Sequence, residues 1–594
     1  MKELFCDILV VGAGGGALRA AIAAAETNPE LKVQIVTRGK FGQSGVTAIS
    51  CSDRMAFHAT LPYTQPQGAD NWRYHAEDIY KIGGFVSDPE LAEILAKSSG
   101  SAVEDLVQLG VPFVKDEAGR LDQFLTDGSI YPRACYTGPH TANHISQALK
   151  RRVEKLKIPV LEEHYCFELA VEEGQVIGAW ALPEGLSSWE DPHKELVFIH
   201  AKAVILATGG AGEVYEHNVF PPGASGDGYA MALMAGAAVI NLEFIQLGLC
   251  STKTKLACSG SIMRAMPRFI NSDGEELFLG EKWPELIFSK GASWPLSVEH
   301  PAHQIDLLVA RELGKGKQVF LDFSTNPQGF SWEKLTEDLV SQYQTEQSQD
   351  LGKRRFTSPL ARLKEINQPA IQWLAQHGVD LEAGDLLEIR PQAQHFQGGV
   401  WINAKAEASL PGLYAVGEVA GGQHGANRPG GNALLDTQVF GKIAGQEGAK
   451  FASGSSFGSL PTPPLIAQDD GIEAGEVLTQ VRKIMDQYAA VIRWEAGLAI
   501  AGRELEHLRK QKIVPGSGCW ERVLEAQSSL LVAQAVVKAA SLRPESRGPH
   551  LYLSTPEGEP LGRDEAYGRS LSLRGTELKP SWISWDEEEE KCAR

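Results

Sequence analysis

Asp7-Ile-Leu-Val-Val-Gly-Ala-Gly-Gly-Gly-Ala17 is the stretch of this sequence that decides the fold. Its apolar run predicts a buried strand, the glycines of 12–16 a tight turn, and Ala17–Glu26 an alanine-rich helix. A second apolar run, Val33–Val36, completes a β-α-β unit. Glycines between a strand and a helix let the backbone approach a pyrophosphate at the positive end of the helix. The stretch therefore predicts an α/β domain that binds a dinucleotide. The second strand ends at Thr37 without the acidic residue that usually binds ribose hydroxyls, which disfavours NAD in this pocket.

The rest of this domain is interrupted in the sequence. A β-hairpin is predicted at Cys166–Ala181, turning at Glu173-Gly174, and the strand Ala203–Leu206 follows it. Residues 241–367 then change in composition, with several tryptophans and prolines and no β-α-β rhythm. Strand-like segments return at Gly399–Asn403 and Leu413–Val416. We therefore expect one discontinuous domain, at 1–240 and 368–450, with an inserted domain at 241–367.

The C-terminal part of the chain predicts a separate helical domain. Residues 451–470 are rich in Ser, Gly and Pro and read as a linker. Apolar residues then recur at helical spacing in three successive segments, which predicts a small bundle over 471–548. The remaining residues, 549–594, form a C-terminal segment with an acidic tail at Asp586–Glu590.

Composition excludes several classes of function. The 594 residues are 43% hydrophobic and 22% charged, a balance typical of globular proteins, and the net charge of −19 argues against a nucleic-acid partner. The eight cysteines include no C-x-x-C pair, so we predict neither a metal site nor an iron–sulfur cluster in this chain. The sequence shows neither an export signal nor an apolar stretch long enough for a membrane span. We expect a cytoplasmic protein that reaches a membrane only through partners.

Further glycine motifs follow in a fixed order along the chain. Ala207-Thr208-Gly209-Gly210 comes directly after a predicted strand, and Ser225-Gly226-Asp227-Gly228 follows it. Later come Gly417-Glu418-Val419 and the run from His424 to Leu434, which reads His-Gly-Ala-Asn-Arg-Pro-Gly-Gly-Asn-Ala-Leu. Each motif alone could be a plain turn, but unrelated turns would rarely occur together in this order and at these distances.

With Glu545-Ser-Arg-Gly548, this set resembles the flavoprotein family of succinate dehydrogenase, fumarate reductase, L-aspartate oxidase and adenylylsulfate reductase. The resemblance implies a Rossmann-like α/β FAD-binding domain, an inserted α+β capping domain and a C-terminal helical domain. It implies cofactor binding by Gly12, Ala13, Gly14, Gly15, Gly16, Ala17, Thr37, Arg38, Ser44, Gly45, Thr208, Gly209, Asp227, Glu418, Asn432, Ala433 and Leu434. Gly45 stands where respiratory members carry the histidine that attaches FAD, so we expect non-covalent FAD.

The dicarboxylate site of the family is altered in this sequence. Only Arg428 is clearly kept, while Gly248, Gly260, Ile305 and Gln394 stand at positions where the family has substrate-binding residues. Each lost charge-assisted hydrogen bond would cost about 1.5–3 kcal/mol of binding. Arg428, His395 and Arg264 are the catalytic candidates. The residues near these altered positions are of two kinds: apolar, at Leu249, Met263, Met266 and Ile305, and basic, at Arg264, Arg268, His303 and His395. This combination predicts a larger, partly apolar substrate with one anionic end.

The leading hypothesis is an FAD-dependent oxidoreductase subunit that transfers hydride between FAD and an organic acid or enoate-like substrate. The resemblance implies electron exchange with an iron–sulfur protein partner. An electron-transfer subunit with a vestigial substrate pocket remains open, as does fumarate reductase or succinate dehydrogenase proper. An oxidase similar to L-aspartate oxidase would share the same missing dicarboxylate residues.

Overall fold

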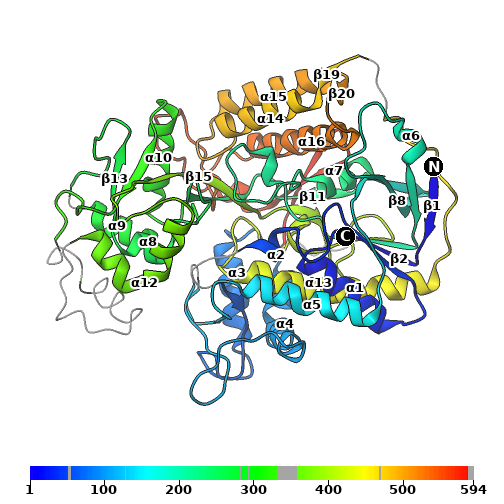
Figure 1. Cartoon of the computed structure of the whole chain (residues 1–594), viewed down its shortest axis with the longest axis horizontal. Coiled ribbons are helices and arrows are strands. Elements are labelled where there is room, and N and C mark those ends of the chain that lie inside the picture. Colours follow the sequence, from blue (N-terminus) through cyan, green and yellow to red (C-terminus); the bar gives the residue numbers. More distant parts are fainter. Residues whose placement is uncertain are drawn as a thin grey trace.

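The computed structural model of the protein describes residues 1–50, 55–126, 129–280, 282–291, 293, 295–331, 337, 358–466 and 470–585. The acidic tail therefore lies outside the described residues. A central α/β body carries a lobe of helices and strands at one end and a layer of three long helices along one side (Figure 1). The lobe is the inserted domain, which we call the cap.

The body is built on a five-stranded sheet whose neighbouring strands all run parallel. Its order is β17 (Leu413–Ala415), β10 (Ala203–Leu206), β2 (Ile8–Val11), β3 (Val33–Val36) and β6 (Val160–Leu161). All four residues of β2 are buried, as expected for a central strand covered on both faces. The structure thus confirms the predicted β-α-β unit and the return of the chain to the same sheet after the insert.

Two helices packed face to face cover one side of this sheet. Helix α1 (Gly15–Thr27) starts two residues earlier than predicted, so that two of the predicted turn glycines form its first turn. Helix α13 (Asn432–Gly454) lies against α1 (Figure 1). A Cβ on Gly445 would stand 2.2 Å from Ala20 O, so only glycine permits this approach. Because α13 runs to Gly454, the first residues of the predicted linker are helical.

Two further sheets complete the body. The first is β1 (Lys2–Phe5), β9 (Val197–His200), β8 (Gln175–Pro183) and β7 (His164–Glu172), and it contains the predicted hairpin with its turn at Glu173-Gly174. The second is β18 (Ala420–Gly421), β16 (Gly399–Trp401), β11 (Ala238–Ile240), β21 (Ser570–Arg574) and β22 (Lys579–Ile583). The C-terminal segment thus adds a β-hairpin to the body, which the sequence did not predict.

The cap contains a four-stranded antiparallel sheet and a core of its own. The strand order is β12 (Ile245–Ser251), β15 (Leu387–Phe396), β14 (Val319–Asp322) and β13 (Arg268–Asn271). The helices are α8 (Gly260–Arg264), α9 (Trp283–Lys290), α10 (His303–Gly314) and α12 (Pro359–Gln376). The cap therefore has the α+β composition that the family resemblance implies.

The predicted boundary of the cap at residue 367 falls inside α12, which kinks at Asn367 but continues. The apolar core of the cap includes Leu387 and Ile389, whereas Phe396 belongs to the core of the body. Strand β12 pairs with β15 along the whole length of β12, so both ends of the insert contribute to its sheet. We propose that the insert extends into β15, at least as far as Ile389.

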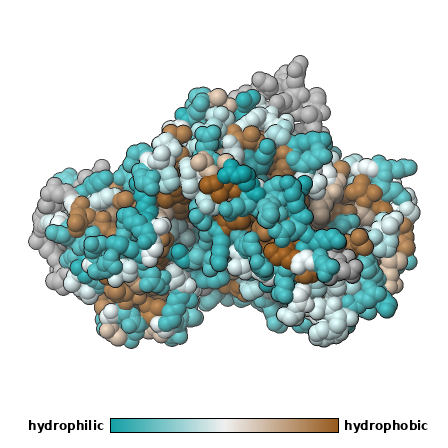
Figure 2. All heavy atoms as spheres, turned by 90° about the horizontal axis from the view of Figure 1, so that it is seen from above, coloured by the Kyte–Doolittle hydropathy of each residue, from teal (hydrophilic) through white to brown (hydrophobic). Residues whose placement is uncertain are grey.

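The helical domain consists of α14 (Ala474–Tyr488), α15 (Glu495–Arg509) and α16 (Trp520–Leu542), as the apolar spacing predicts. Helix α16 is buried on most sides because it packs against α14, α15 and α7 (Asp227–Met234) of the body. None of the helices in the described part of the chain combines the length and apolar character that crossing a bilayer requires. The face seen in Figure 2 is mainly hydrophilic, with apolar residues in separate patches.

Candidate active site

A cavity of about 1300 Å³ extends from the carboxyl ends of the parallel strands to the cap. In open α/β sheets this is the edge at which ligands bind. Among the residues predicted to bind the cofactor, its wall contains Gly12, Ala13, Gly14, Gly15, Gly16, Thr37, Arg38, Ser44, Gly45, Thr208, Gly209, Asp227, Glu418, Ala433 and Leu434. The three catalytic candidates, Arg428, His395 and Arg264, line the same cavity. Tertiary structure therefore brings together segments that lie far apart in the sequence.

Two of the predicted cofactor residues do not line this cavity. Ala17 is buried inside α1, where it packs in the core of the body. Asn432 is also buried, and its Oδ1 atom lies 2.8 Å from His58 Nδ1 and 3.1 Å from His75 Nε2. Asn432 thus fixes two buried histidines behind the wall rather than facing the cavity.

Glycines give the cavity the bare backbone that a dinucleotide needs. Gly12 has φ +113°, and a Cβ there would stand 2.3 Å from Ala207 O, so this turn can only be made by glycine. Gly45 and Gly209 also have positive φ, and a Cβ on either would meet no protein atom within 4 Å. These positions leave open space where a side chain would otherwise stand, and the wall residues therefore fit FAD.

No acidic residue directly follows β3 in the sequence, but the fold brings a carboxylate from a distant segment to this position. Glu184, at the end of the hairpin, lines the cavity and accepts a hydrogen bond from Arg38 Nε at 2.9 Å. The guanidinium of Arg38 also pairs with Glu525 and lies over the ring of Tyr165, 5.0 Å from its centroid. Burial alone would lower the pKa of Arg38, but Glu525 and Glu184 raise it above its usual value. Arg38 is thus held firmly at the cavity edge.

Asp227 is buried at the start of α7 with its carboxylate at the cavity wall. Ser225 Oγ lies 3.0 Å from both carboxylate oxygens, and the Tyr165 hydroxyl donates to Oδ1. Burial is the largest influence on this carboxyl and raises its pKa to about 6. These donors hold the carboxylate in the orientation that hydroxyl groups of a cofactor could use.

Arg428 is the group in this site whose charge is least compensated. Its side chain is buried, and its pKa is lowered to about 10 by burial. Its guanidinium makes one weak contact, from Nη1 to Pro429 O at 3.5 Å, and no ion pair with any described residue. The nearby carboxyls of Glu418 and Asp436 do not neutralise it fully, because burial raises their pKa values to about 8 and about 7.

Three other buried arginines of the protein are ion-paired, and a fourth, Arg493, donates to the backbone carbonyls of Ala489, Ala490 and Glu243. Arg133 pairs with Asp78, and Arg543 pairs with Glu243 at 2.7 Å. Arg547 donates to Glu545 from two nitrogens. A buried cation without such a partner costs several kcal/mol, as a rough general figure. The unpaired guanidinium of Arg428 therefore marks a site for an anion.

A β-bulge brings two neighbouring residues of β15 to the cavity wall. Gln246 pairs with His395 and Leu247 with Ala393, which leaves Gln394 as the extra residue. In a regular strand Gln394 and His395 would face opposite sides, yet both line the cavity. Burial, then the charges of Arg428 and His424, holds the pKa of His395 well below its usual value. His395 is therefore a neutral imidazole near pH 7.

The comparisons with known proteins agree with this architecture. Residues 7–434 match the model of an FAD binding domain, and residues 478–573 match that of the fumarate reductase flavoprotein C-terminal region. The chain belongs to the FAD-binding fumarate reductase and succinate dehydrogenase flavoprotein family. It is accordingly an FAD-dependent oxidoreductase of this type.

Several relatives in this family match over nearly their full length. The chain is 31% identical to one subunit of the fumarate reductase (CoM/CoB) of Methanothermobacter marburgensis, over 98% of this chain and 99% of that protein. It is 25% identical to the fumarate reductase flavoprotein subunit of Escherichia coli, over 93% and 88%. Among solved structures, Sdh1 of Mycobacterium smegmatis in complex with UQ1 matches with a TM-score of 0.79 and 24% identity, over 98% and 94%. The similarity to Sdh1 shows that the two proteins share a fold.

Within this family fold, the cap wall differs from the sequence-based expectation. Leu249, Met263, Met266 and Ile305 are fully buried in the cap and do not line the cavity. These four side chains therefore form no part of the cavity wall, because they are buried inside the cap. Arg268 pairs with Asp322, and His303 stands outside the cavity wall. Arg264 does line it, and a Cβ on Gly291 would lie 2.9 Å from its Cγ.

Sequence reasoning missed several polar residues of the flavoprotein's cavity, among them Glu184, Ser293 and His300. Glu184 directly follows the hairpin strand β8, whereas the other two lie in the cap between α9 and α10. None belongs to a glycine motif, so no local sequence pattern identifies them. Only the packing of distant segments reveals their position.

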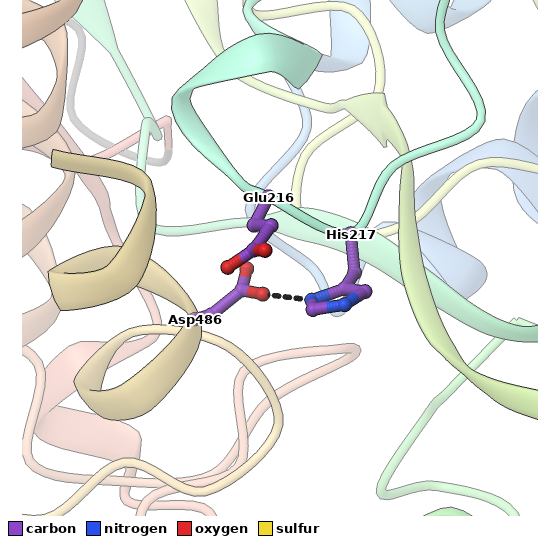
Figure 3. A group of neighbouring side chains, drawn as sticks. All are labelled: Glu216, His217 and Asp486. Atoms are coloured by element: carbon purple, nitrogen blue, oxygen red, sulfur yellow. Dashed lines mark hydrogen bonds and ion pairs between the residues drawn. The ribbon is translucent and has the colours of Figure 1, made fainter. Parts of the chain in front are cut away.

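One group of potential metal ligands lies outside this cavity. Glu216 and His217 follow the 3₁₀ turn after β10, and Asp486 comes from α14 (Figure 3). His217 Nδ1 contacts Asp486, and Arg390 of β15 contacts its Nε2. Both ring nitrogens are therefore engaged, and the group joins the helical domain to the cap strand β15.

Proposed function

We propose that this protein binds FAD non-covalently and transfers hydride between the flavin and an organic acid or enoate-like substrate whose carboxylate is held by Arg428. The observation that supports this function most strongly is the buried guanidinium of Arg428 without an ion-pair partner among the described residues. An anionic substrate would supply the missing charge. The same site would serve either direction of reaction.

The residues of the cavity have distinct tasks in this proposal. Arg428 binds the carboxylate and orients the substrate, and His395, a neutral imidazole, accepts or donates a hydrogen bond beside it. The glycines at 12–16, 45 and 209 hold the cofactor through bare backbone, and Asp227 and Glu418 hold its polar groups. FAD, when bound, is the group that accepts or supplies the hydride.

Non-covalent binding is supported by the segment around Gly45. This glycine caps helix α2 (Val46–Ile49), and no side chain stands at the position from which a covalent bond would be made. The histidine nearest to Gly45 in the sequence is His58, which is buried. Its two ring nitrogens contact Asn432 and Thr126, so neither is available for a bond to the flavin.

The proposed electron partner is an iron–sulfur protein subunit. The described cysteines are free, and no three of them form a group of potential metal ligands among the described residues. In this proposal, electrons enter or leave the flavin through a partner or a soluble acceptor. Relatives include the 8-methylmenaquinol:fumarate reductase flavoprotein subunit of Wolinella succinogenes. We propose a cytoplasmic protein whose contact with a membrane, if it is part of a complex there, is made by partners.

A second candidate function is fumarate reductase or succinate dehydrogenase proper, which the names of several relatives favour. The deciding experiment is an anaerobic titration of the purified holoprotein, in which flavin absorbance is followed with succinate, fumarate and bulkier enoates. Bleaching by succinate or reoxidation by fumarate would establish the second candidate. Reaction with a bulkier acid alone would establish a changed substrate, and silence from every acid would indicate an electron-transfer protein instead.

The role of Arg428 has a direct test. Arg428→Ala should keep FAD but lose turnover, because the glycine turn at 12–16 comes from another segment of the cavity wall and keeps its own backbone contacts. The matched control is Arg503→Ala on the exposed side of α15, which should behave as wild type. Unchanged turnover in the Arg428 variant would remove this residue from the mechanism.

A further inference from the structure

The cap carries a histidine, His300, that lines the cavity and has one ring nitrogen without a hydrogen-bond partner among the described residues. Its Nδ1 accepts a hydrogen bond from Ala302 N–H at 3.2 Å, and Ser293 Oγ lies 3.0 Å from the same nitrogen. Because Nδ1 is an acceptor, the proton of the neutral ring belongs on Nε2. No hydrogen bond joins Nε2 to any residue that the structure describes, and His300 lines the cavity.

The loop that carries His300 is fixed to the C-terminal segment of the chain. Val298 N donates to Gly548 O at 2.9 Å, and Gly548 N donates to the carboxylate of Glu299 at 3.0 Å. Glu299 also pairs with Arg563 at 2.6 Å. The side chain of Glu299 is thus fixed by two contacts, and His300 is the next residue in the chain.

Gly548 also contacts the loop that carries Arg428. It has φ +54°, and a Cβ there would stand 3.0 Å from the Cβ of Ala426, two residues before Arg428. One glycine of the Glu545–Gly548 motif therefore packs against the cap loop on one side and the arginine loop on the other. Gly548 thus links the loop that carries His300 to the loop that carries Arg428.

The surroundings keep His300 uncharged. Burial, then Lys290 and His303, lowers the pKa of its imidazole below the usual value. Lys290 is itself paired with Asp306 at 2.6 Å, and both side chains are almost fully buried. A neutral imidazole with its proton on Nε2 is a hydrogen-bond donor for an oxygen atom, and it cannot act as a strong acid.

We propose that His300 is a specificity-determining residue of the cap, whose Nε2–H binds the carboxylate or carbonyl oxygen of the substrate at the end remote from Arg428. This inference rests on the proposed function, because it assumes an organic acid held by Arg428. It places a donor on the cap although Gly248, Gly260 and Ile305 stand where the sequence resemblance expects substrate-binding groups. The substrate class is then an organic acid with a second oxygen-bearing group.

The test compares two acids that share one carbon skeleton, fumarate and crotonate, in which a methyl group replaces the second carboxylate. The holoprotein is reduced anaerobically, and reoxidation of the flavin is measured as kcat and KM for each acid. His300→Phe keeps the ring shape and removes both nitrogens. We expect kcat/KM for fumarate to fall about 10- to 100-fold, the loss of one hydrogen bond to a charged group, while crotonate changes by less than about twofold.

A conservative variant and a remote control separate this role from a structural one. His300→Asn retains a side-chain donor and acceptor and should recover most of the activity with fumarate. His507→Phe makes the same change on the exposed face of α15 and should leave both acids unaffected. FAD content and thermal unfolding are measured for each variant so that misfolding is recognised.

The outcomes distinguish the two proposals. An equal fall for both acids in His300→Phe, or no fall for either, would overturn the role of His300 while the proposed function stands. If wild-type flavin is reoxidised by neither acid nor by any other enoate, the proposed function fails, and the role of His300 fails with it.

Discussion

The ion pair between Lys290 and Asp306 is predicted to be the most sensitive electrostatic contact of the cap. The two side chains are 2.6 Å apart and each is 1% exposed. In Lys290→Met the carboxyl of Asp306 loses its cation in a buried site. It must then either stay charged without a partner or bind a proton, so its pKa rises in the folded state.

The magnitude follows from the proton that Asp306 must bind. An unfolded aspartate has a pKa of about 3.9, so keeping it protonated at pH 7 costs about 4 kcal/mol. This agrees with the roughly 3–5 kcal/mol measured when one partner of a buried pair is removed. Since the folded pKa is raised, stability falls as pH rises above about 3.9, and the cost at pH 5 is only about 1.5 kcal/mol.

Hydrogen exchange and thermal unfolding of the holoprotein would measure this loss. For a unit of about 150–250 residues, 4 kcal/mol corresponds to a fall of about 8–16 °C in the melting temperature of the cap. Protection should decrease in peptides from α9 and α10, and the decrease should be smaller at pH 5. The double variant Lys290→Met/Asp306→Leu should regain most of the stability because no buried charge remains.

A matched control is Lys317→Met, which removes a more exposed cap lysine paired with Asp273 and Glu275. It should change the cap little, because surface ion pairs contribute little to stability. Equal stability of Lys290→Met and wild type at pH 7, or a double variant no more stable than the single one, would refute the reasoning.

Three further predictions concern the flavin cavity. Burial raises the pKa of Glu418 to about 8, above about 4.3 in the unfolded chain, so the apoprotein should lose about 1.4 kcal/mol of stability per pH unit as pH rises between these values. Glu418→Gln should reduce the pH dependence of urea unfolding between about pH 5.5 and about pH 7.5 by this amount, while the raised pKa values of Asp227 and Asp436 leave a remainder, and an unchanged slope would contradict the assignment. Gly12→Ala should weaken FAD binding at least about 100-fold in a flavin fluorescence titration, because its Cβ would stand 2.3 Å from Ala207 O. The control Gly475→Ala in α14 should bind FAD normally, because a Cβ there meets no atom within 4 Å. Acid precipitation of the holoprotein should release the flavin into the supernatant, since Gly45 offers no side chain for attachment, and flavin in the pellet would show a covalent bond.

The cofactor half of the site was predictable because its signals are local. The turn after β2 requires positive φ and therefore a glycine. The strand and the helix on either side of it can be recognised from the spacing of their apolar residues. The motif containing Arg428 is likewise contiguous in sequence. Prediction was weaker where side chains compete for two roles. Met263 and Ile305 could line a pocket or fill a core, and the cap uses them for its core.

The boundaries and partners of the cap depend on contacts that no local pattern encodes. Strand β15 pairs with β12 although more than a hundred residues separate them, so the end of the cap could not be located from composition. The C-terminal hairpin pairs with β11 in the same way. A bulge of a single residue decides that both Gln394 and His395 face the cavity, and the hydrophobic pattern on either side of it is compatible with other registers.

The sequence by itself determined the α/β class, the dinucleotide turn, the three C-terminal helices and the retention of Arg428, because each depends on residues close together in the chain. Tertiary structure alone decided that Arg428 is buried without an ion pair among the described residues, that Glu184 stands at the end of β3, and that His300 faces the cavity from the cap. These features arise where segments distant in sequence pack together. Burial and neighbouring charges there, rather than residue type, set which groups are charged and which nitrogens are free.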